Sequence, residues 1–211
     1  KDIGELKRIF LSPGPIFDPE DRMDDYWGYT EAFYSVGFRP GDVVQVTFNY
    51  HLSPAGLMFE EPLRNLGCAS IPAGPTDPGT QLDIMQKLRV SGYVGTASYL
   101  MHLAQKAEEK GINLRKDLFQ EVAFVTGERL SEKMRNQLEK KFDIILRQGY
   151  GTADVGCIGY ECFHKTGLHI SNRCYVEICH PDTGIPLKDG EVGEIVVTSF
   201  NKTYPLIRLA T

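Results

Sequence analysis

The chain has 211 residues, of which 42% are hydrophobic and 24% are charged, and its formal net charge is -5 at pH 7. This length and composition are typical of a globular chain that buries a core in one large domain or two small ones. The negative charge and scattered basic residues exclude a broad basic face, so we expect no nucleic-acid partner. No stretch approaches the roughly 18 apolar residues of a membrane span, and the opening lacks a signal-peptide core, so we expect a cytoplasmic protein with no membrane partner.

The first 40 residues are expected to form a loop and a helix that precede the main domain. Three prolines and a glycine lie between Pro13 and Pro19. Proline fixes the backbone and removes an N–H donor, so this segment predicts a rigid loop and not a helix.

Residues 41–156 alternate short apolar runs with helical patterns. Ser98 and Ser131 are placed to cap two of the helices, and Gly111 is placed to end the first of these. Strand–helix alternation over ~100 residues predicts an α/β fold with a largely parallel sheet and flanking helices, and with ligands beyond the carboxyl ends of the strands. The expected strands are Val43 to Phe48, Cys68 to Gly74, Gly92 to Thr96, Glu121 to Gly127 and Asp143 to Gly149.

Residues 157–211 show strand-like alternation broken by the turns "PDTG" and "KDGEVG", with no helical period. This pattern predicts a small antiparallel, barrel-like β subdomain. The chain stops in the apolar run "YPLIRLAT", so we expect a fragment of a longer protein.

The stretch "QGYGTADVGC", residues 148–157, concentrates groups that chemistry uses. A dinucleotide fingerprint would require glycine where Asp154 stands, which excludes that interpretation. Two interpretations stay open. In one, Tyr150 stacks on a base, Thr152 offers a hydroxyl and Asp154 binds magnesium; in the other, the stretch is an ordinary turn with a capping aspartate.

The ordered series "VTGERLS", "YGTADVG", "ECFHKTGLHI", "VEICHPDTGIPLKDGEVGEIVVTS" and "YPLIR" resembles the phenylacetate-CoA ligase branch of the adenylate-forming enzymes, from about residue 39 onward. The resemblance implies a two-step reaction in which a carboxylate attacks the α-phosphate of ATP and coenzyme A then displaces AMP to form a thioester. It implies ATP, magnesium and coenzyme A as cofactors, and a nucleotide and a small aromatic carboxylic acid as partners.

Position by position, the resemblance implies a nucleotide site. Asp154 takes the place of the family's magnesium-linked glutamate, and Thr152 supplies a hydroxyl beside it, so both are expected in the catalytic machinery. Ala153 departs from the family pattern, which has a hydroxyl residue there. The nucleotide-binding residues implied are Gly127, Glu128, Arg129, Tyr150 and Gly151.

The same resemblance implies an acyl pocket with aromatic walls. Its candidate residues also fit a plain hydrophobic core, because aromatic side chains at strand ends often have only a packing role. The candidates are Phe48, Tyr50, Tyr99, Val125 and Thr126.

Five cysteines, four of them between Cys157 and Cys179, favour reduced thiols or a metal site over disulfides. Cys162 and His169 match positions where some members of the resembled branch hold zinc together with a Cys-x-Cys pair further along. Two ligands cannot close a tetrahedral site by themselves, so zinc and buried, unligated side chains both stay open.

The family's phosphate loop is rich in serine, threonine and glycine, whereas this chain has "LSPGPIFDPE" there, with fewer backbone donors for a phosphate. The alternative function is therefore a non-catalytic module that binds a small acid and has impaired ATP binding. A ribose-binding aspartate and a C-terminal domain are expected beyond Thr211, so we expect this chain alone to be inactive. The sequence leaves a homodimer open.

Overall fold

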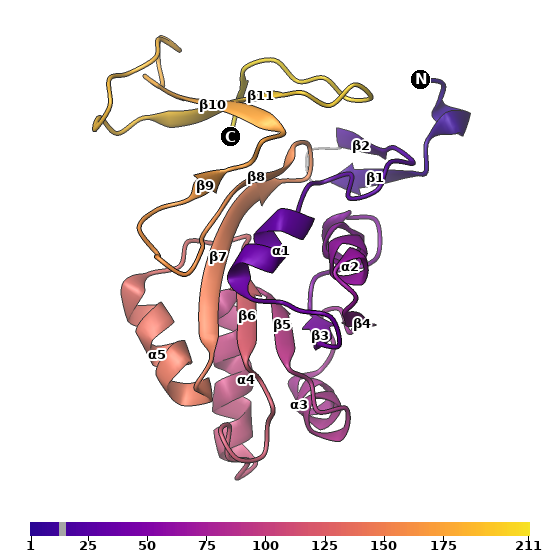
Figure 1. Ribbon diagram of the computed structural model, residues 1–211, viewed down its shortest axis with the longest axis vertical. Coiled ribbons are helices and arrows are strands. Elements are labelled where there is room, and N and C mark those ends of the chain that lie inside the picture. The colour runs from indigo at the N-terminus through magenta and orange to yellow at the C-terminus, as the bar shows by residue number, and fades with distance from the viewer. Residues whose placement is uncertain (13–15) are drawn as a thin grey trace.

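The computed structural model describes residues 1–12 and 16–211, and its main body is a seven-stranded sheet in the order β4-β3-β5-β6-β7-β8-β9 (Figure 1). Strands β3 to β7 are parallel, and β8 and β9 extend the sheet with antiparallel pairing. The expected α/β fold is therefore confirmed. The strands are β3 Val43–Val46, β4 Ala69–Pro72, β5 Gly92–Gly95, β6 Val122–Val125, β7 Ile145–Thr152, β8 Gly156–Tyr160 and β9 His169–Ile170.

All five predicted strands are present, but each differs from the prediction at one end or both. Strand β3 ends at Val46, two residues before the predicted end at Phe48, whereas β7 runs through Thr152 into the stretch that was expected to be a loop. The expected boundary between residues 156 and 157 falls at the start of β8, which pairs with β7. The antiparallel segment therefore begins as part of the main sheet.

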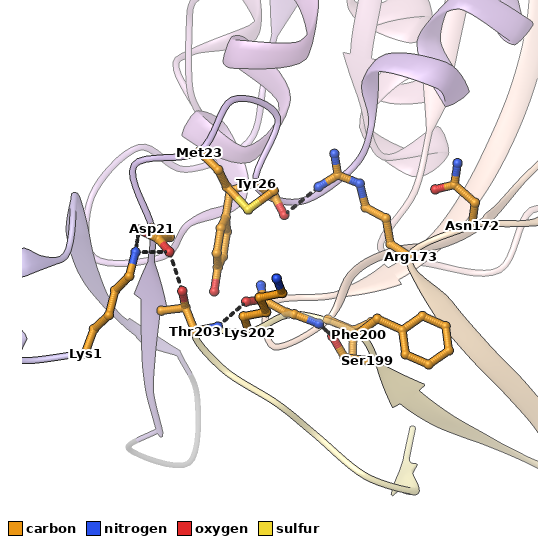
Figure 2. Close-up of a pocket in the computed structure, with 12 residues that line it drawn as sticks. Lys1, Asp21, Met23, Tyr26, Asn172, Arg173, Ser199, Phe200, Lys202 and Thr203 are labelled. Atoms are coloured by element: carbon orange, nitrogen blue, oxygen red, sulfur yellow. Dashed lines mark hydrogen bonds and ion pairs between the residues drawn. The ribbon is translucent and has the colours of Figure 1, made fainter.

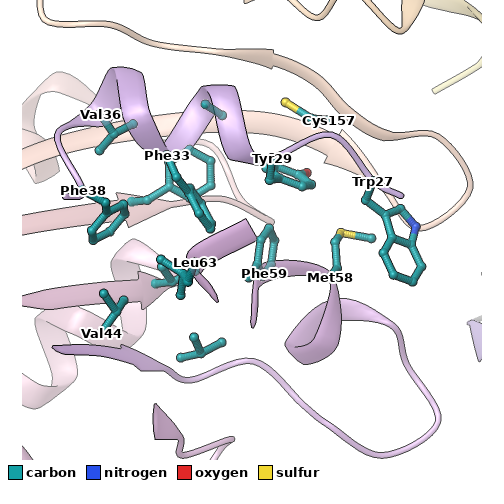
Figure 3. Close-up of a cluster of buried hydrophobic side chains, with 14 of the residues drawn as sticks. Trp27, Tyr29, Phe33, Val36, Phe38, Val44, Met58, Phe59, Leu63 and Cys157 are labelled. Atoms are coloured by element: carbon teal, nitrogen blue, oxygen red, sulfur yellow. The ribbon is translucent and has the colours of Figure 1, made fainter. Parts of the chain in front are cut away.

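Helices cover both faces of the parallel strands. Helices α1 Thr30–Val36 and α2 Ala55–Asn65 pack on one face, where Phe33 and Phe59 lie in an aromatic cluster (Figure 3). The Phe124 ring packs against both, with centroids 5.0 Å and 6.3 Å away. The other face carries α3 Pro78–Lys87, α4 Ala97–Glu109 and α5 Glu132–Phe142. Burial on both faces explains why the parallel strands read as continuous apolar runs.

Local side-chain caps fix where the helices begin. The Ser131 side chain accepts a hydrogen bond from the backbone N–H of Met134, so the predicted cap of α5 is confirmed. The predicted cap of α4 at Ser98 is wrong, because the side chain of Thr96 accepts from Tyr99 N and Ser98 lies inside the helix. The strand before α4 ends at Gly95, which leaves Thr96 at the capping position.

The N-terminal region folds as a hairpin, so the expected rigid loop is wrong for its described part. Short helix η1 Ile3–Glu5 precedes β1 Arg8–Ser12, which pairs with β2 Ile16–Glu20 in antiparallel register. Pro19 is accommodated inside β2. The prediction for Pro13 and Pro15 falls on residues outside those described.

A separate three-stranded antiparallel sheet ends the chain, as the sequence predicted. It consists of β10 Cys174–Cys179, β11 Glu194–Ser199 and β12 Leu209–Ala210 in the order β10-β11-β12. Among the residues that the structure describes, no helix is long and apolar enough to cross a membrane.

A buried ion pair fixes α5 to the end of β8. Arg135 Nη2 lies 2.6 Å from Glu161 Oε1, and both side chains are almost fully buried. Gln148 N donates to Glu161 Oε2 at 3.0 Å, and Gln148 Nε2 donates to Glu161 Oε1 at 2.9 Å. Burial by itself raises the pKa of Glu161, but these hydrogen bonds outweigh burial and lower it below its usual value. Through these bonds the pair fixes Gln148, the residue directly before the Gly149–Asp154 stretch.

Candidate active site

The sheet has a topological switch point between β3 and β5. The chain leaves β3 towards β4 on one side and returns through α3 to β5 on the other side of β3. At such a point the connections diverge and leave a crevice at the carboxyl ends of the strands, where α/β proteins bind ligands.

A cavity of about 200 Å³ lies at this switch point. Thr47 follows β3 directly and Thr96 follows β5 directly, so two hydroxyl residues stand at adjacent strand ends. Both threonines line the cavity together with Phe48, Pro75 and Tyr99. Sequence reasoning missed Thr47, Thr96 and Pro75, although their positions at strand ends could have indicated the two threonines.

Hydrogen bonds hold the walls of this cavity in place. Tyr99 Oη donates to Thr76 O at 2.7 Å. Thr47 Oγ1 donates to Tyr93 Oη at 3.2 Å, and Tyr93 Oη donates to Thr96 O at 3.0 Å. The hydroxyls of Tyr93 and Tyr99 are thus bonded to backbone carbonyls. The rings of Phe48 and Tyr99 give the cavity a mostly apolar lining.

The residues predicted for an acyl pocket separate into two groups. Phe48 and Tyr99 line the cavity, and the Phe48 ring packs on Phe59 with centroids 5.0 Å apart. Tyr50, Val125 and Thr126 are not among the residues that line it.

Tyr50 packs its ring against Gly56, and its hydroxyl is buried without a partner among the described residues. Burial raises the pKa of this phenol. Val125 and Thr126 are buried at the end of β6. Strand alternation cannot relate Phe48 to Tyr50, because β3 ends at Val46.

The predicted adenine-binding segment is an exposed loop directly after β6. Gly127 has a φ of 82°, a value that favours glycine, and a side chain there would lie 3.6 Å from the Phe48 ring. Glu128 accepts from Ser98 N at 2.5 Å and from Ser98 Oγ at 2.9 Å. This bond ties the loop to the first turn of α4 and gives Glu128 a structural role, while Arg129 remains exposed.

The turn between β7 and β8 carries the remaining predicted nucleotide residues. A side chain at Gly151 would collide with Tyr29 Oη and Gly156 O, so packing alone explains this glycine. The register of the two strands shifts between Tyr150 and Gly151, and such bulges often occur next to active sites. Thr152 Oγ1 accepts from Val155 N at 3.1 Å, which closes the turn and leaves the hydroxyl proton free to donate. Tyr150 Oη donates to Thr211 Oγ1 at 2.9 Å.

Asp154 faces a carboxylate that sequence reasoning missed. Asp18 in β2 is only 1% exposed, and Asp154 is close enough for its negative charge to raise the pKa of Asp18. Burial makes the largest contribution, and together these effects raise the pKa of Asp18 to about 6. A hairpin interpretation of "RIFLS" and "IFDPE" could have indicated Asp18, because period-two alternation turns it inward with Glu20.

A second, larger cavity of about 630 Å³ lies between the N-terminal segment and the end of the chain (Figure 2). Arg173 lines this cavity, and its Nη1 donates to Asp25 O at 2.6 Å and to Tyr26 O at 3.2 Å. Asp21 accepts hydrogen bonds from Lys1 and Thr203. These contacts join segments from both ends of the described chain.

The predicted zinc residues lie near the β8–β9 connection. His169 pairs opposite Tyr160 in the sheet, with ring centroids 5.7 Å apart. Cys162 Sγ accepts a hydrogen bond from His164 N at 3.4 Å. No group of three or more histidine, cysteine or acidic side chains able to hold a metal occurs in the described part of the chain. The described residues therefore do not complete a zinc site.

Comparison with known proteins decides the family. The model of a family described as "AMP-binding enzyme" matches residues 25–202. The chain belongs to the AMP-binding enzyme family. The resemblance inferred from its motifs is thus confirmed.

Curated relatives of this member of the AMP-binding enzyme family include two phenylacetate-coenzyme A ligases. The one from Pseudomonas putida is 30% identical over 182 residues, which are 84% of this chain and 41% of that protein. The one from Escherichia coli (strain K12) is 28% identical over 225 residues, which cover 98% of this chain and 50% of that protein. The chain thus spans about half or less of the length of the relatives it matches.

Solved structures of CoA ligases share the fold of this chain. A 2-hydroxyisobutyryl-CoA ligase superposes with a TM-score of 0.90 at 21% identity, over 98% of this chain and 48% of that chain. A benzoate CoA ligase from Burkholderia xenovorans LB400 superposes with a TM-score of 0.72 at 16% identity, over 96% of this chain and 42% of that chain.

Proposed function

We propose that the protein of which this chain is part activates a small aromatic carboxylic acid with ATP and transfers the acyl group to coenzyme A. A carboxylate oxygen attacks the α-phosphorus, and the bond to the β-phosphate oxygen breaks to release pyrophosphate. The thiolate of coenzyme A then attacks the acyl carbon, a C–S bond forms, and AMP leaves.

The observation that carries this proposal is the meeting of four neighbouring strand ends, those of β3, β5, β6 and β7. The cavity at the ends of β3 and β5 adjoins the loop after β6, since a side chain at Gly127 would lie 3.6 Å from the Phe48 ring. Strand β7, next in the sheet, carries the turn with Tyr150 and Asp154. An acid bound in the cavity would lie next to a nucleotide bound over the ends of β6 and β7. The carboxylate of the acid would then lie close to the α-phosphate of the nucleotide.

The chemistry of the first step is a problem of charge, because both reactants are anions. In the proposal the hydroxyl of Thr152 donates to a phosphate oxygen, and the exposed Arg129 neutralises charge nearby. Asp154 is a half-buried carboxylate and fits a magnesium ion, which prefers hard oxygen ligands. Bound there with the nucleotide, magnesium would supply electrostatic stabilisation of the developing charge.

A small aromatic acid is favoured by the size and lining of the cavity. About 200 Å³ is less than the roughly 300 Å³ at which pockets for drug-sized ligands begin, so a single-ring acid suits it better than a long acyl chain. The rings of Phe48 and Tyr99 offer flat apolar walls. The names of the relatives, phenylacetate-CoA ligases and a benzoate CoA ligase, point to the same class of acid.

Acid-dependent exchange of pyrophosphate into ATP by the full-length protein tests the first step. We expect exchange with phenylacetate or benzoate above that with 2-hydroxyisobutyrate, and thioester formation when coenzyme A is added. Phe48→Ala should raise KM for the acid by about tenfold through lost contact, whereas Tyr34→Ala, at an exposed site away from the cavity, should not. Absence of exchange with every acid would overturn the proposal.

A second candidate function is a non-catalytic module that binds a small acid. It is favoured by Ala153, which replaces a hydroxyl residue of the family pattern, and by two carboxylates where phosphates would approach. Calorimetric titration of the full-length protein with the acid, and with ATP and magnesium, separates the two. Acid binding without nucleotide binding supports the module. The 211-residue chain alone is expected to produce no thioester in either case.

A further inference from the structure

Two inward-facing acidic residues of β2 have opposite environments. Glu20 and Asp18 are each 1% exposed. Glu20 lies 2.9 Å from both Lys7 Nζ and Arg8 Nη1, so its charge is compensated. Both carboxylate oxygens of Asp18 are buried without a hydrogen-bond partner among the described residues. A buried carboxylate without a partner costs free energy, so Asp18 requires a different explanation.

The carboxyl of Asp154 lies near Asp18, since its negative charge helps to raise the pKa of Asp18. The turn that carries Asp154 is fixed against the N-terminal segment, because Trp27 Nε1 donates to Ala153 O at 3.1 Å. The Trp27 ring in turn packs on Phe10 of β1, with centroids 5.7 Å apart. The hairpin and the turn are therefore held together by contacts independent of the two acids.

Tyr204 lies within the electrostatic reach of both carboxyls. The charges of Asp154 and Asp18 both raise the pKa of Tyr204, after the larger effect of burial. The Ser12 hydroxyl approaches Asp18 without reaching hydrogen-bond geometry. No lysine or arginine among the described residues forms an ion pair with either acid.

Two carboxylates are both hydrogen-bond acceptors, so only a shared proton or a cation can join them. A divalent cation matches what is present, because magnesium takes one or two carboxylates, with hydroxyls, waters and phosphate oxygens in its other positions. Residues of the described chain supply two carboxylates and a nearby hydroxyl.

We propose that Asp18 is a second carboxylate ligand, together with Asp154, of a divalent cation that this chain binds before any nucleotide arrives. The cation bridges the hairpin to the β7–β8 turn. Its use in holding the phosphates of ATP rests on the proposed function, but its binding does not. A hydroxyl-rich loop would donate hydrogen bonds directly to the phosphate oxygens. The hairpin of this chain would instead bind the phosphates through the cation.

Binding of Mn²⁺ to the full-length protein without nucleotide, followed by electron paramagnetic resonance near neutral pH, tests this site. We expect saturable binding to the wild type, weakened about tenfold to hundredfold in Asp18→Asn and in Asp154→Asn. Asp24→Asn removes the same charge from an exposed position of the same segment and should leave the affinity unchanged.

Thermal unfolding gives an independent measurement. Without metal, Asp18→Asn should melt above the wild type, since it removes an uncompensated buried charge; with Mg²⁺ the wild type should gain melting temperature and the variant should not. If Asp18→Asn fails to fold, Asp18→Ser replaces it in both measurements. The change in the melting temperature of the wild type on addition of Mg²⁺ also tests the site.

The outcomes separate this inference from the proposed function. Mn²⁺ binding that needs Asp18, in a protein that shows no pyrophosphate exchange, supports the site and overturns only the ligase activity. Wild-type affinity in Asp18→Asn, or Mn²⁺ binding only after ATP is added, overturns the site whatever the activity.

Discussion

The seven-stranded sheet and the three-stranded sheet of β10, β11 and β12 differ in how their faces are covered. Helices pack on both faces of the first, and its two clusters of buried side chains contain its largest aromatic and aliphatic residues. The core cluster under the second has three fully buried members, Ile158, Cys174 and Val197. Val192 and Ile207 of the same region are 98% and 81% exposed.

The unequal cover of the two sheets indicates which of them contributes most of the stability of the chain. Parallel strands need cover on both faces, whereas an antiparallel sheet can leave one face to solvent. The parallel sheet should therefore unfold last, and changes in it should cost the most. The small sheet should tolerate substitution at its exposed face.

The largest expected effect is on the ion pair that anchors the main sheet. Glu161→Ala leaves Arg135 buried without its partner and should lower the free energy of unfolding by about 3–5 kcal/mol. Denaturant unfolding followed by circular dichroism measures it. The exposed pair Lys87–Asp83 provides the control, since Asp83→Ala should cost less than about 1 kcal/mol. Equal effects at the two pairs would contradict the buried pair's importance.

A core truncation compares the two sheets directly. Leu103 of α4 is fully buried against the main sheet, and Leu103→Ala should cost about 3 kcal/mol through lost burial and a cavity. Val192→Ala, in the small-sheet region, should stay within about 0.5 kcal/mol. Similar losses at both positions would break the comparison.

Acid should weaken the main sheet through Glu161. Its pKa in the folded protein lies below the usual 4.5, so the unfolded state binds more protons as the pH falls past that value. The stabilisation is complete above pH 4.5 and is lost as the pH falls through the lowered pKa. The difference in unfolding free energy between wild type and Glu161→Gln should therefore be constant above about pH 5.5 and shrink in acid. A difference that grows in acid would show the opposite shift.

The smallest effect is expected for the side chain that caps α4. Thr96→Ala removes the hydroxyl that caps α4 and should cost about 1 kcal/mol. Ser98→Ala keeps that cap and the backbone bond from Ser98 to Glu128, so it should cost about half as much or less. Thermal unfolding of both variants measures the order, and a larger loss at Ser98 would restore the cap predicted from sequence.

Much of the fold was accessible from local patterns. Apolar runs located all five parallel strands, and Ser131 was correctly assigned as a cap, because strand burial and capping depend on neighbours a few residues apart. The ends were less accurate: β3 stops at Val46, so the inferred alternation of Phe48 and Tyr50 does not exist. The N-terminal hairpin was missed because prolines masked its period-two pattern.

The candidate site was accessible only in part. Motif order indicated the loop after β6 and the turn after β7, and Phe48 and Tyr99 do line a common cavity. Gly151 stays a predicted nucleotide-binding residue, but a side chain there would also collide with Tyr29, so packing by itself requires glycine at this position. That contact joins two distant segments, so no local pattern could indicate it.

The alternation of strands and helices and the family follow from the sequence alone, because both depend on the order and local spacing of residues. Which charged side chains meet depends on the tertiary structure. Glu161 forms an ion pair with Arg135, and Glu20 forms ion pairs with Lys7 and Arg8. Asp18 lies near Asp154, and no lysine or arginine among the described residues forms an ion pair with it. These pairings depend on how the hairpin, α5 and the β7–β8 turn fold against one another, and burial then makes each of them far stronger, or more costly, than it would be in water.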